Sequence, residues 1–274
     1  MAEDPHNTYT HGHHESVLRS HTWRTVENSA KFLIPHLKTA TSLLDVGCGP
    51  GTITVDFAKN YMPNGKVTGV EYSESVLEKG RAHAESEGVK NIEFEFGDIY
   101  NLKYPDNTFD VVYAHQVLQH LSNPVLALKE LRRVVKPNGV VAVRDSDYET
   151  FVMYPELGGL AEWKAQYSKI ARSNNAEPNA GRRLFSWALQ AGYPRSDIMC
   201  SSSTWCYSTK EEIAWWSSLW AERTLKSDSA TTALKNGVAT QEELERSARA
   251  WREWGSAEDA WFSMIHGEII YRKA

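Results

Sequence analysis

A glycine-rich turn preceded by an acidic residue is the part of the sequence best suited to binding a ligand. Residues 43–52 read Leu-Leu-Asp-Val-Gly-Cys-Gly-Pro-Gly-Thr, an apolar run followed by a glycine at every second position. Glycine tolerates positive φ and lets a ligand approach bare backbone. Asp45 stands just before Gly47, at the expected carboxyl end of a strand, where open α/β sheets bind their ligands. The segment therefore predicts a binding loop.

Further carboxylates follow at the expected ends of the next two strands. Glu71 closes the apolar run 67–71, about 20 residues after the last glycine, where a carboxylate can accept hydrogen bonds from both hydroxyls of an adenosine ribose. Asp98 follows the third run and can accept from an adenine amino group, while Ile99 can pack on the ring. Together with Asp45, these residues predict a nucleoside-containing ligand.

The glycine spacing separates two kinds of nucleotide cofactor. Dinucleotide-binding loops use G-x-G-x-x-G, because the pyrophosphate must reach the amides at a helix N-terminus. Here the spacing is G-x-G-x-G, and Asp45 would repel a pyrophosphate. The pattern therefore favours a cationic ligand and disfavours a nicotinamide-dependent oxidoreductase.

The elements that must position these residues alternate between short apolar runs and helical stretches, which is typical of a parallel sheet. Strands are expected at 42–46, 66–71, 92–97, 109–114 and 139–144, with later strands at 197–207 and 261–271. Helices are expected at 52–61, 75–86 and 124–135. We predict an α/β fold with a doubly wound, Rossmann-like and mostly parallel seven-stranded sheet.

The length of 274 residues favours a single domain, 1–274, elaborated by helices. We expect residues 1–41 to form a helical N-terminal lid and residues 42–145 to form the ligand-binding core. Residues 146–195 are expected to form a helical insertion, and 196–274 C-terminal strands and helices. Nine of the ten tryptophans follow the core, which predicts a helical cover with an aromatic interior over the substrate.

Three segments resemble class I, seven-stranded methyltransferases that use S-adenosylmethionine, in particular the ubiquinone and menaquinone biosynthesis type. They are Leu-Asp-Val-Gly-Cys-Gly-Pro-Gly-Thr at 44–52, Phe-Asp-Val-Val-Tyr-Ala at 109–114 and Val-Lys-Pro-Asn-Gly at 135–139. The layout is more distantly similar to fungal enzymes that methylate sulfur in dithiol secondary metabolites such as reduced gliotoxin. The sulfonium and amino group of S-adenosylmethionine are cationic and suit the acidic loop.

The resemblance implies a set of cofactor-binding residues, which are Arg24, Asp45, Gly47, Cys48, Gly49, Glu71, Tyr72, Asp98, Ile99 and His115. Segment 19–25 would form a lid, and the residues after the fourth strand would line the methionine end of the cofactor. His115 is also the candidate catalytic residue, either taking a proton from the acceptor or shaping the pocket. For His120 the pocket-shaping role is favoured, and Cys48 is expected to pack behind the turn.

Possible metal ligands occur in two places, but neither offers a complete set. One is the N-terminal group of His11, His13, His14 and Glu15. The other is Asp145 with Asp147 after the fifth strand, where catechol-type methyltransferases hold magnesium. We expect no metal; the alternatives for these two aspartates are orienting a substrate, capping a helix and forming a hydrogen-bonded turn.

Composition restricts the partners. The formal net charge of −5 and the lack of a lysine and arginine stripe disfavour nucleic acid, and no apolar run reaches the ~20 residues that span a bilayer. No export signal is visible, and three cysteines without a C-x-x-C pair fit a reducing compartment, so a cytoplasmic protein is predicted. The oligomeric state stays open.

The sequence as a whole predicts an S-adenosylmethionine-dependent methyltransferase. Its acceptor is expected to be an apolar or aromatic small molecule methylated at sulfur, carbon or oxygen, with a thiol of a secondary metabolite as one possibility. Methyl transfer is an in-line displacement that depends chiefly on positioning. The alternative is a non-catalytic protein that senses the cofactor or binds a partner on the same fold.

Overall fold

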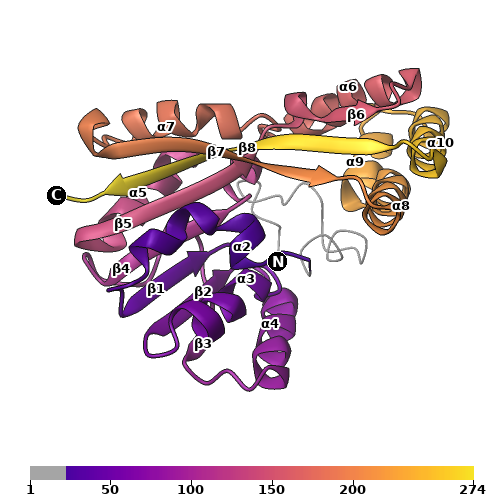
Figure 1. Ribbon diagram of the computed structural model, residues 1–274. Coiled ribbons are helices and arrows are strands. Elements are labelled where there is room, and N and C mark those ends of the chain that lie inside the picture. The colour runs from indigo at the N-terminus through magenta and orange to yellow at the C-terminus, as the bar shows by residue number, and fades with distance from the viewer. Residues whose placement is uncertain (1–22) are drawn as a thin grey trace.

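One eight-stranded sheet forms the centre of the computed structural model, which describes residues 23–274 (Figure 1). The strands are β1 (Ser42–Val46), β2 (Lys66–Glu71), β3 (Ile92–Phe96), β4 (Phe109–His115), β5 (Val135–Ser146), β6 (Val152–Tyr154), β7 (Ile198–Tyr207) and β8 (Trp261–Arg272). Their order is β3-β2-β1-β4-β5-β8-β6, and β7 pairs along the other edge of β8. Strands β1 to β5 pair in parallel and β8 is antiparallel to its neighbours. The predicted mostly parallel, Rossmann-like sheet is confirmed.

Helices cover both faces of the sheet. The α-helices are α2 (Val26–Ser29), α3 (Thr52–Asp56), α4 (Glu74–Ser86), α5 (Pro124–Val134), α6 (Gly158–Ser173), α7 (Leu184–Gln190), α8 (Lys210–Lys226), α9 (Asp228–Lys235) and α10 (Gln241–Ser256). Short 3₁₀ turns are η1 (Lys31–His36), η3 (Leu118–His120), η4 (Tyr148–Thr150), η5 (Gly181–Arg183) and η6 (Arg195–Asp197), and η2 (Phe57–Tyr61) is a π-helical continuation of α3. Because successive side chains of a strand point to opposite faces, Leu44 packs with α5 and α7, whereas Leu43 packs with α2 and α3.

The fifth strand is longer than expected. Helix α5 starts at Pro124, where the Asn123 side chain accepts from the Leu126 N–H, and it ends at Val134. The expected stop signal 136–139 lies inside β5, which begins at Val135 because that residue pairs with Phe109 across a bulge. The stop signal therefore predicted the end of helix α5 to within one residue, but β5 begins four residues earlier than predicted.

The sheet has one strand more than the seven expected. Strand β6 lies in a segment predicted to be helical, and it pairs with residues 261–263 of β8. Strand β5 covers only residues 266–272 of β8, so the other end of this 12-residue strand needs another partner on the same edge. Figure 1 shows β8, in yellow, running from the parallel sheet out to α8 and α10.

Helices α6, α8 and α10 pack together around the far ends of β7 and β8 and form what we call the aromatic cover. Its interior contains the buried tryptophans Trp163, Trp205, Trp216, Trp220, Trp251 and Trp254. Capping boxes start two of its helices, because Thr209 and Thr240 each exchange hydrogen bonds with a glutamate three residues later. Two of its helices, α8 and α10, come from residues 210–256 between β7 and β8, and α6 comes from the segment 146–195.

The N-terminal part of the described chain lies against both the sheet and the aromatic cover. Trp23 packs edge-on against Trp205, at 5.3 Å between ring centroids, and against Tyr207 at 5.4 Å. The histidine-rich candidate metal site at 11–15 and residues 19–22 of the expected lid lie outside the described residues. Among the helices that the structure describes, none has the length and apolar character to cross a membrane.

Candidate active site

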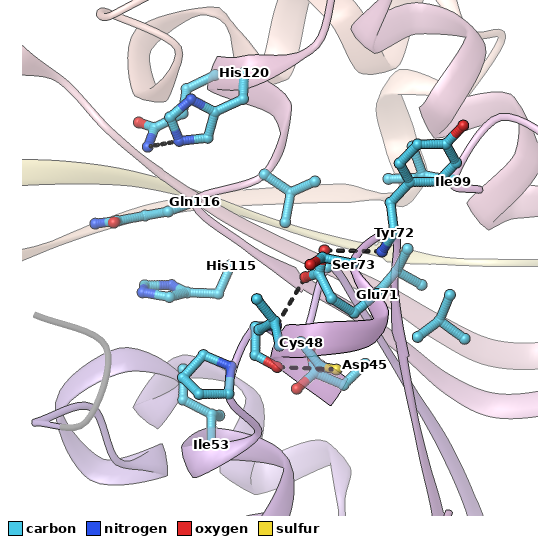
Figure 2. Close-up of a pocket in the computed structure, with 18 of the residues that line it drawn as sticks. Asp45, Cys48, Ile53, Glu71, Tyr72, Ser73, Ile99, His115, Gln116 and His120 are labelled. Atoms are coloured by element: carbon cyan, nitrogen blue, oxygen red, sulfur yellow. Dashed lines mark hydrogen bonds between the residues drawn. The ribbon is translucent and has the colours of Figure 1, made fainter. Parts of the chain in front are cut away.

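The carboxyl ends of β1, β2, β3 and β4 open into a cavity of about 240 Å³ (Figure 2). All the residues expected to bind the cofactor line it, namely Arg24, Asp45, Gly47, Cys48, Gly49, Glu71, Tyr72, Asp98, Ile99 and His115. They come from four strand ends and the N-terminal segment, and parallel strands bring their carboxyl ends to one edge of the sheet. The structure thus gathers in one place residues that are up to 91 positions apart in sequence from Arg24 to His115.

The glycine loop turns where a side chain has no room. Gly47 has φ 71°, and its N–H donates to the carbonyl oxygen of Val70 at 2.7 Å. A Cβ on Gly47 would lie 2.4 Å from Cγ2 of Val117. The side chain of Cys48 points behind the turn toward Gly69, as expected, and burial raises the pKa of its thiol well above the ordinary value. The loop backbone is therefore left open to the cavity.

Glu71 is held by backbone donors from two sides. Its carboxylate accepts from the Gly49 N–H at 3.0 Å and from the Tyr72 N–H at 2.8 Å. Burial raises the pKa of Glu71, and these backbone hydrogen bonds oppose the rise. The acid that ends β2 is thus fixed in place beside the glycine loop.

Asp45 is buried at the floor of the cavity. Thr54, in the first turn of α3, donates its hydroxyl to Oδ2 of Asp45 at 2.7 Å. Burial raises the pKa of Asp45 to about 7, with the nearby charge of Glu71 adding to the rise and the Thr54 hydrogen bond opposing it. Two poorly solvated carboxylates so close together favour a cationic ligand, which would relieve both the desolvation and the repulsion.

Asp98 is the third carboxylate that lines this acidic end of the cavity. Its carboxylate accepts from the Tyr100 N–H at 2.9 Å, and Ile99 beside it is buried. Tyr72 is half-exposed at the rim and packs against Phe96, with ring centroids 5.2 Å apart. A flat ring could therefore lie between Ile99 and the rim while its polar edge faces Asp98.

His115 and Gln116 line the opposite side, at the end of β4 (Figure 2). His115 is buried, and its ring lies parallel to that of Tyr113 at 6.3 Å. Gln116 has φ 53°, and its Oε1 accepts from Nη2 of Arg24 at 2.6 Å. Since arginine can only donate, the Gln116 amide nitrogen donates to Nε2 of His266 at 3.0 Å. Gln116 thus links the N-terminal segment to β8 across the cavity wall.

Sequence reasoning missed several lining or supporting residues, three of which matter most here. Tyr148 and Arg223 line the cavity from η4 and α8, and His266 holds Gln116 from β8. Burial, with Arg144 and Arg24, holds the pKa of His266 well below its usual range. No local motif surrounds these residues in the sequence, so only the tertiary fold reveals them.

His120 also lines the cavity and stays neutral. Burial lowers the pKa of His120 to about 3, and the charges of Arg24 and Arg223 contribute to the fall. Nε2 of His120 lies 3.0 Å from Nε2 of Gln119. The expectation that His120 shapes the pocket remains a prediction, and its low pKa makes it a weak base.

The two aspartates considered for magnesium are engaged elsewhere. Asp145 is fully buried, does not line the cavity and accepts from the Gln119 N–H at 3.2 Å. Asp147 accepts from Nε and Nη2 of Arg182 at 2.5 and 2.7 Å. Within residues 23–274, no group of three or more His, Cys, Asp or Glu side chains is placed to hold a metal ion. These contacts tie the two carboxylates to residues far along the chain, and the roles considered for them remain predictions.

Sheet order and cavity together define the class of protein. Five parallel strands beside a reversed β8, with an acid before and after the glycine turn, are the arrangement of class I methyltransferases that use S-adenosylmethionine. A family model described as "Methyltransferase domain" matches residues 37–212, and the chain belongs to this family. It is an S-adenosylmethionine-dependent methyltransferase.

Individual relatives agree with this assignment. An uncharacterized methyltransferase of Schizosaccharomyces pombe is 39% identical, over 97% of this chain and 96% of its own length. A demethylmenaquinone methyltransferase of Staphylococcus aureus is 34% identical, over 45% of this chain and 51% of its own, which bears out the predicted resemblance. The crystal structure of a putative methyltransferase from Bacillus halodurans has the same fold, with a TM-score of 0.56 and 20% identity over 89% of this chain and 97% of its own.

Proposed function

We propose that this methyltransferase acts on an apolar or aromatic small molecule, at sulfur, carbon or oxygen. The observation that carries the proposal is the single cavity that joins the acidic strand ends to a region lined by Leu121, Tyr148 and His115. Beyond that region lies the aromatic cover, whose rings favour a flat, apolar acceptor. A thiol of a secondary metabolite belongs to this acceptor class.

The acidic end fits the cofactor group by group. Glu71 would accept from the ribose hydroxyls, and Asp98 from the adenine amino group with Ile99 against the ring. Asp45 and the Gly47 loop would face the methionine amino group, and Arg24 its carboxylate. When bound, the cofactor supplies a methyl carbon activated by the neighbouring sulfonium.

His115 is the side chain placed to act on the acceptor in this arrangement. It lines the cavity at the end of β4, next to Gln116. An alcohol or a protonated thiol would give its proton to the imidazole, whereas an acceptor that arrives as an anion would use His115 for positioning only. The protein otherwise contributes orientation and exclusion of water.

Calorimetry with the cofactor and its demethylated product tests the proposed cofactor contacts. We expect the chain to bind S-adenosylmethionine and S-adenosylhomocysteine with Kd values on the order of micromolar. Glu71→Ala should weaken both by about tenfold or more, because each ribose hydroxyl loses a charged acceptor. The control is Glu78→Ala, on the exposed face of α4. Absence of binding by the unchanged chain, or equal loss in both variants, contradicts the assignment.

A protein that only senses the cofactor would also pass the binding test. Incubation with labelled S-adenosylmethionine and a library of aromatic thiols, phenols and acids separates the two, because only an enzyme transfers label to an acceptor.

The three cysteines are all free, which supports the proposal that the protein works in a reducing compartment such as the cytoplasm.

A further inference from the structure

The described carboxylates and arginines of the cavity lining come from different elements. The carboxylates among its described lining residues, Asp45, Glu71 and Asp98, come from the strand ends. Its arginines, Arg24 and Arg223, come from the N-terminal segment and from α8. Both arginines lower the pKa of His120, which lies on their side of the cavity. Arg223 is the arginine of this pair that the proposed cofactor contacts do not use.

Arg223 belongs to the lining of two cavities. The side chain is only 6% exposed, and its guanidinium carbon lies 4.6 Å from the centroid of the Trp220 ring. Arg223 also lines a smaller cavity of about 30 Å³ within the aromatic cover, between α6, α8 and α9. Stacking on an indole holds a guanidinium in place, because its N–H groups donate in the plane of the group rather than toward the ring.

The smaller cavity has two polar side chains without a hydrogen-bond partner among the described residues. Trp220 and Thr224 line it, and neither the Trp220 indole N–H nor the Thr224 hydroxyl has a partner among residues 23–274. No aspartate or glutamate belongs to its described lining. Buried donors without acceptors cost about 1–3 kcal/mol each, so this site favours a ligand that brings oxygen atoms. Its volume suits a group the size of a carboxylate or a single water molecule.

We propose that Arg223, with Trp220 and Thr224, binds an acidic oxygen of the methyl acceptor, so that the substrate is an aromatic acid or phenolate rather than a neutral hydrocarbon. This inference rests on the proposed function for the identity of the reaction. The aromatic part lies between Tyr148 and Leu121, beside the sulfonium, and the oxyanion reaches Arg223, which lines both cavities. A charged acceptor makes stronger hydrogen bonds to these buried groups than a neutral one, which gives selectivity for the acid.

Matched acids and amides test the charge preference. The protein is saturated with S-adenosylhomocysteine and titrated by calorimetry with benzoate, benzamide, 2-naphthoate and 2-naphthamide at about pH 7.5. Each pair has nearly the same shape and differs in charge, so we expect the acid to bind about tenfold or more tightly than its amide. Equal affinities, or no binding of either acid at millimolar concentration, overturn the proposal. Either result would mean that water alone satisfies the buried Trp220 and Thr224 donors.

Variants assign the preference to Arg223. Arg223→Met should abolish the difference between acid and amide, and Arg223→Lys, which keeps the charge, should retain part of it. Arg249→Met, at a mostly exposed position on α10, is the control and should leave it unchanged. Persistence of the preference in Arg223→Met overturns the proposal, and thermal unfolding shows which variants are folded. If S-adenosylhomocysteine fails to bind, the proposed function fails, whereas the same titrations on the ligand-free protein still decide the subsite.

Discussion

Asp45 carries an energetic conflict at the scale of a single residue. Its carboxyl is 2% exposed, and burial raises its pKa from 3.8 to about 7. The folded protein therefore binds a proton at this site more tightly than the unfolded chain does. The contribution of Asp45 to stability is fully present below about pH 4 and is lost as the pH rises through 7, when the carboxyl ionises in the fold. We infer that the ionised Asp45 carboxylate serves to bind a cationic ligand.

Asp45→Asn should therefore separate stability from binding. At pH 8 we expect the ligand-free variant to melt a few °C above the unchanged protein, with a smaller gain at pH 5, because the cost of ionisation is removed. The unchanged protein should bind S-adenosylmethionine about tenfold more weakly at pH 6 than at pH 8, as the fraction of ionised Asp45 falls. The variant should bind weakly with a flatter pH dependence. Calorimetry and thermal melts at pH 5, 6 and 8 check this; an unchanged slope in the variant would assign the titration to another group, Glu71 first.

At the scale of elements, the glycine turn couples β1 to the loop after β4. Gly47 faces Val117, which lines the same cavity, so the two loops fix each other's position. Gly88, just after the end of α4, has a similar φ of 67°, but no atom lies within 4 Å of where its Cβ would be. The two glycines thus share a left-handed backbone and differ in the neighbour that a side chain would meet.

Alanine substitution of Gly47 and of Gly88 separates the cost of the left-handed backbone from the cost of the clash. Gly88→Ala should lower stability by about 1–2 kcal/mol, the cost of a left-handed non-glycine residue, and leave cofactor affinity unchanged. Gly47→Ala adds the clash with Val117, so we expect a larger loss of stability and a fall in affinity for S-adenosylhomocysteine of about tenfold or more. Denaturant unfolding and calorimetry on both variants measure the two quantities. Equal effects on affinity would mean that the clash does not reach the site.

The same elements show how far sequence alone could go. The loop, Glu71 and Asp98 were predictable because the βα pattern places each of them at a strand end, so local spacing determines their position. Strand β6 was missed because three residues are too few to show an alternating pattern. They form a strand only because they pair with the part of β8 that extends beyond β5. Arg223 and His266 reach the cavity through long-range packing of α8 and β8, which no local pattern encodes.

At the scale of the molecule, β8 belongs to two cores at once. Its residues Phe262 and Met264 pack in the aromatic cover, whereas Ile269 and Tyr271 pack with the sheet and α5. Strand β7 pairs along the same length, from Ile198 to Tyr207. Loosening either core therefore removes ladder hydrogen bonds from the other, and we expect the whole chain to unfold as one cooperative unit, as the predicted single domain requires.

Trp251 offers the sharpest test of this coupling. It is fully buried on α10 and packs edge-on against Trp163 at 4.8 Å, so Trp251→Ala should cost about 3–5 kcal/mol. Trp261→Ala, on the partly exposed outer face of β8, is the control and should cost less. Hydrogen exchange followed by mass spectrometry across a denaturant series should show peptides from α10 and from β4 opening at one midpoint, which Trp251→Ala lowers for both. If α10 opens first while β4 stays protected, the aromatic cover is a separate folding unit, and the acceptor site could then open without disturbing the cofactor site.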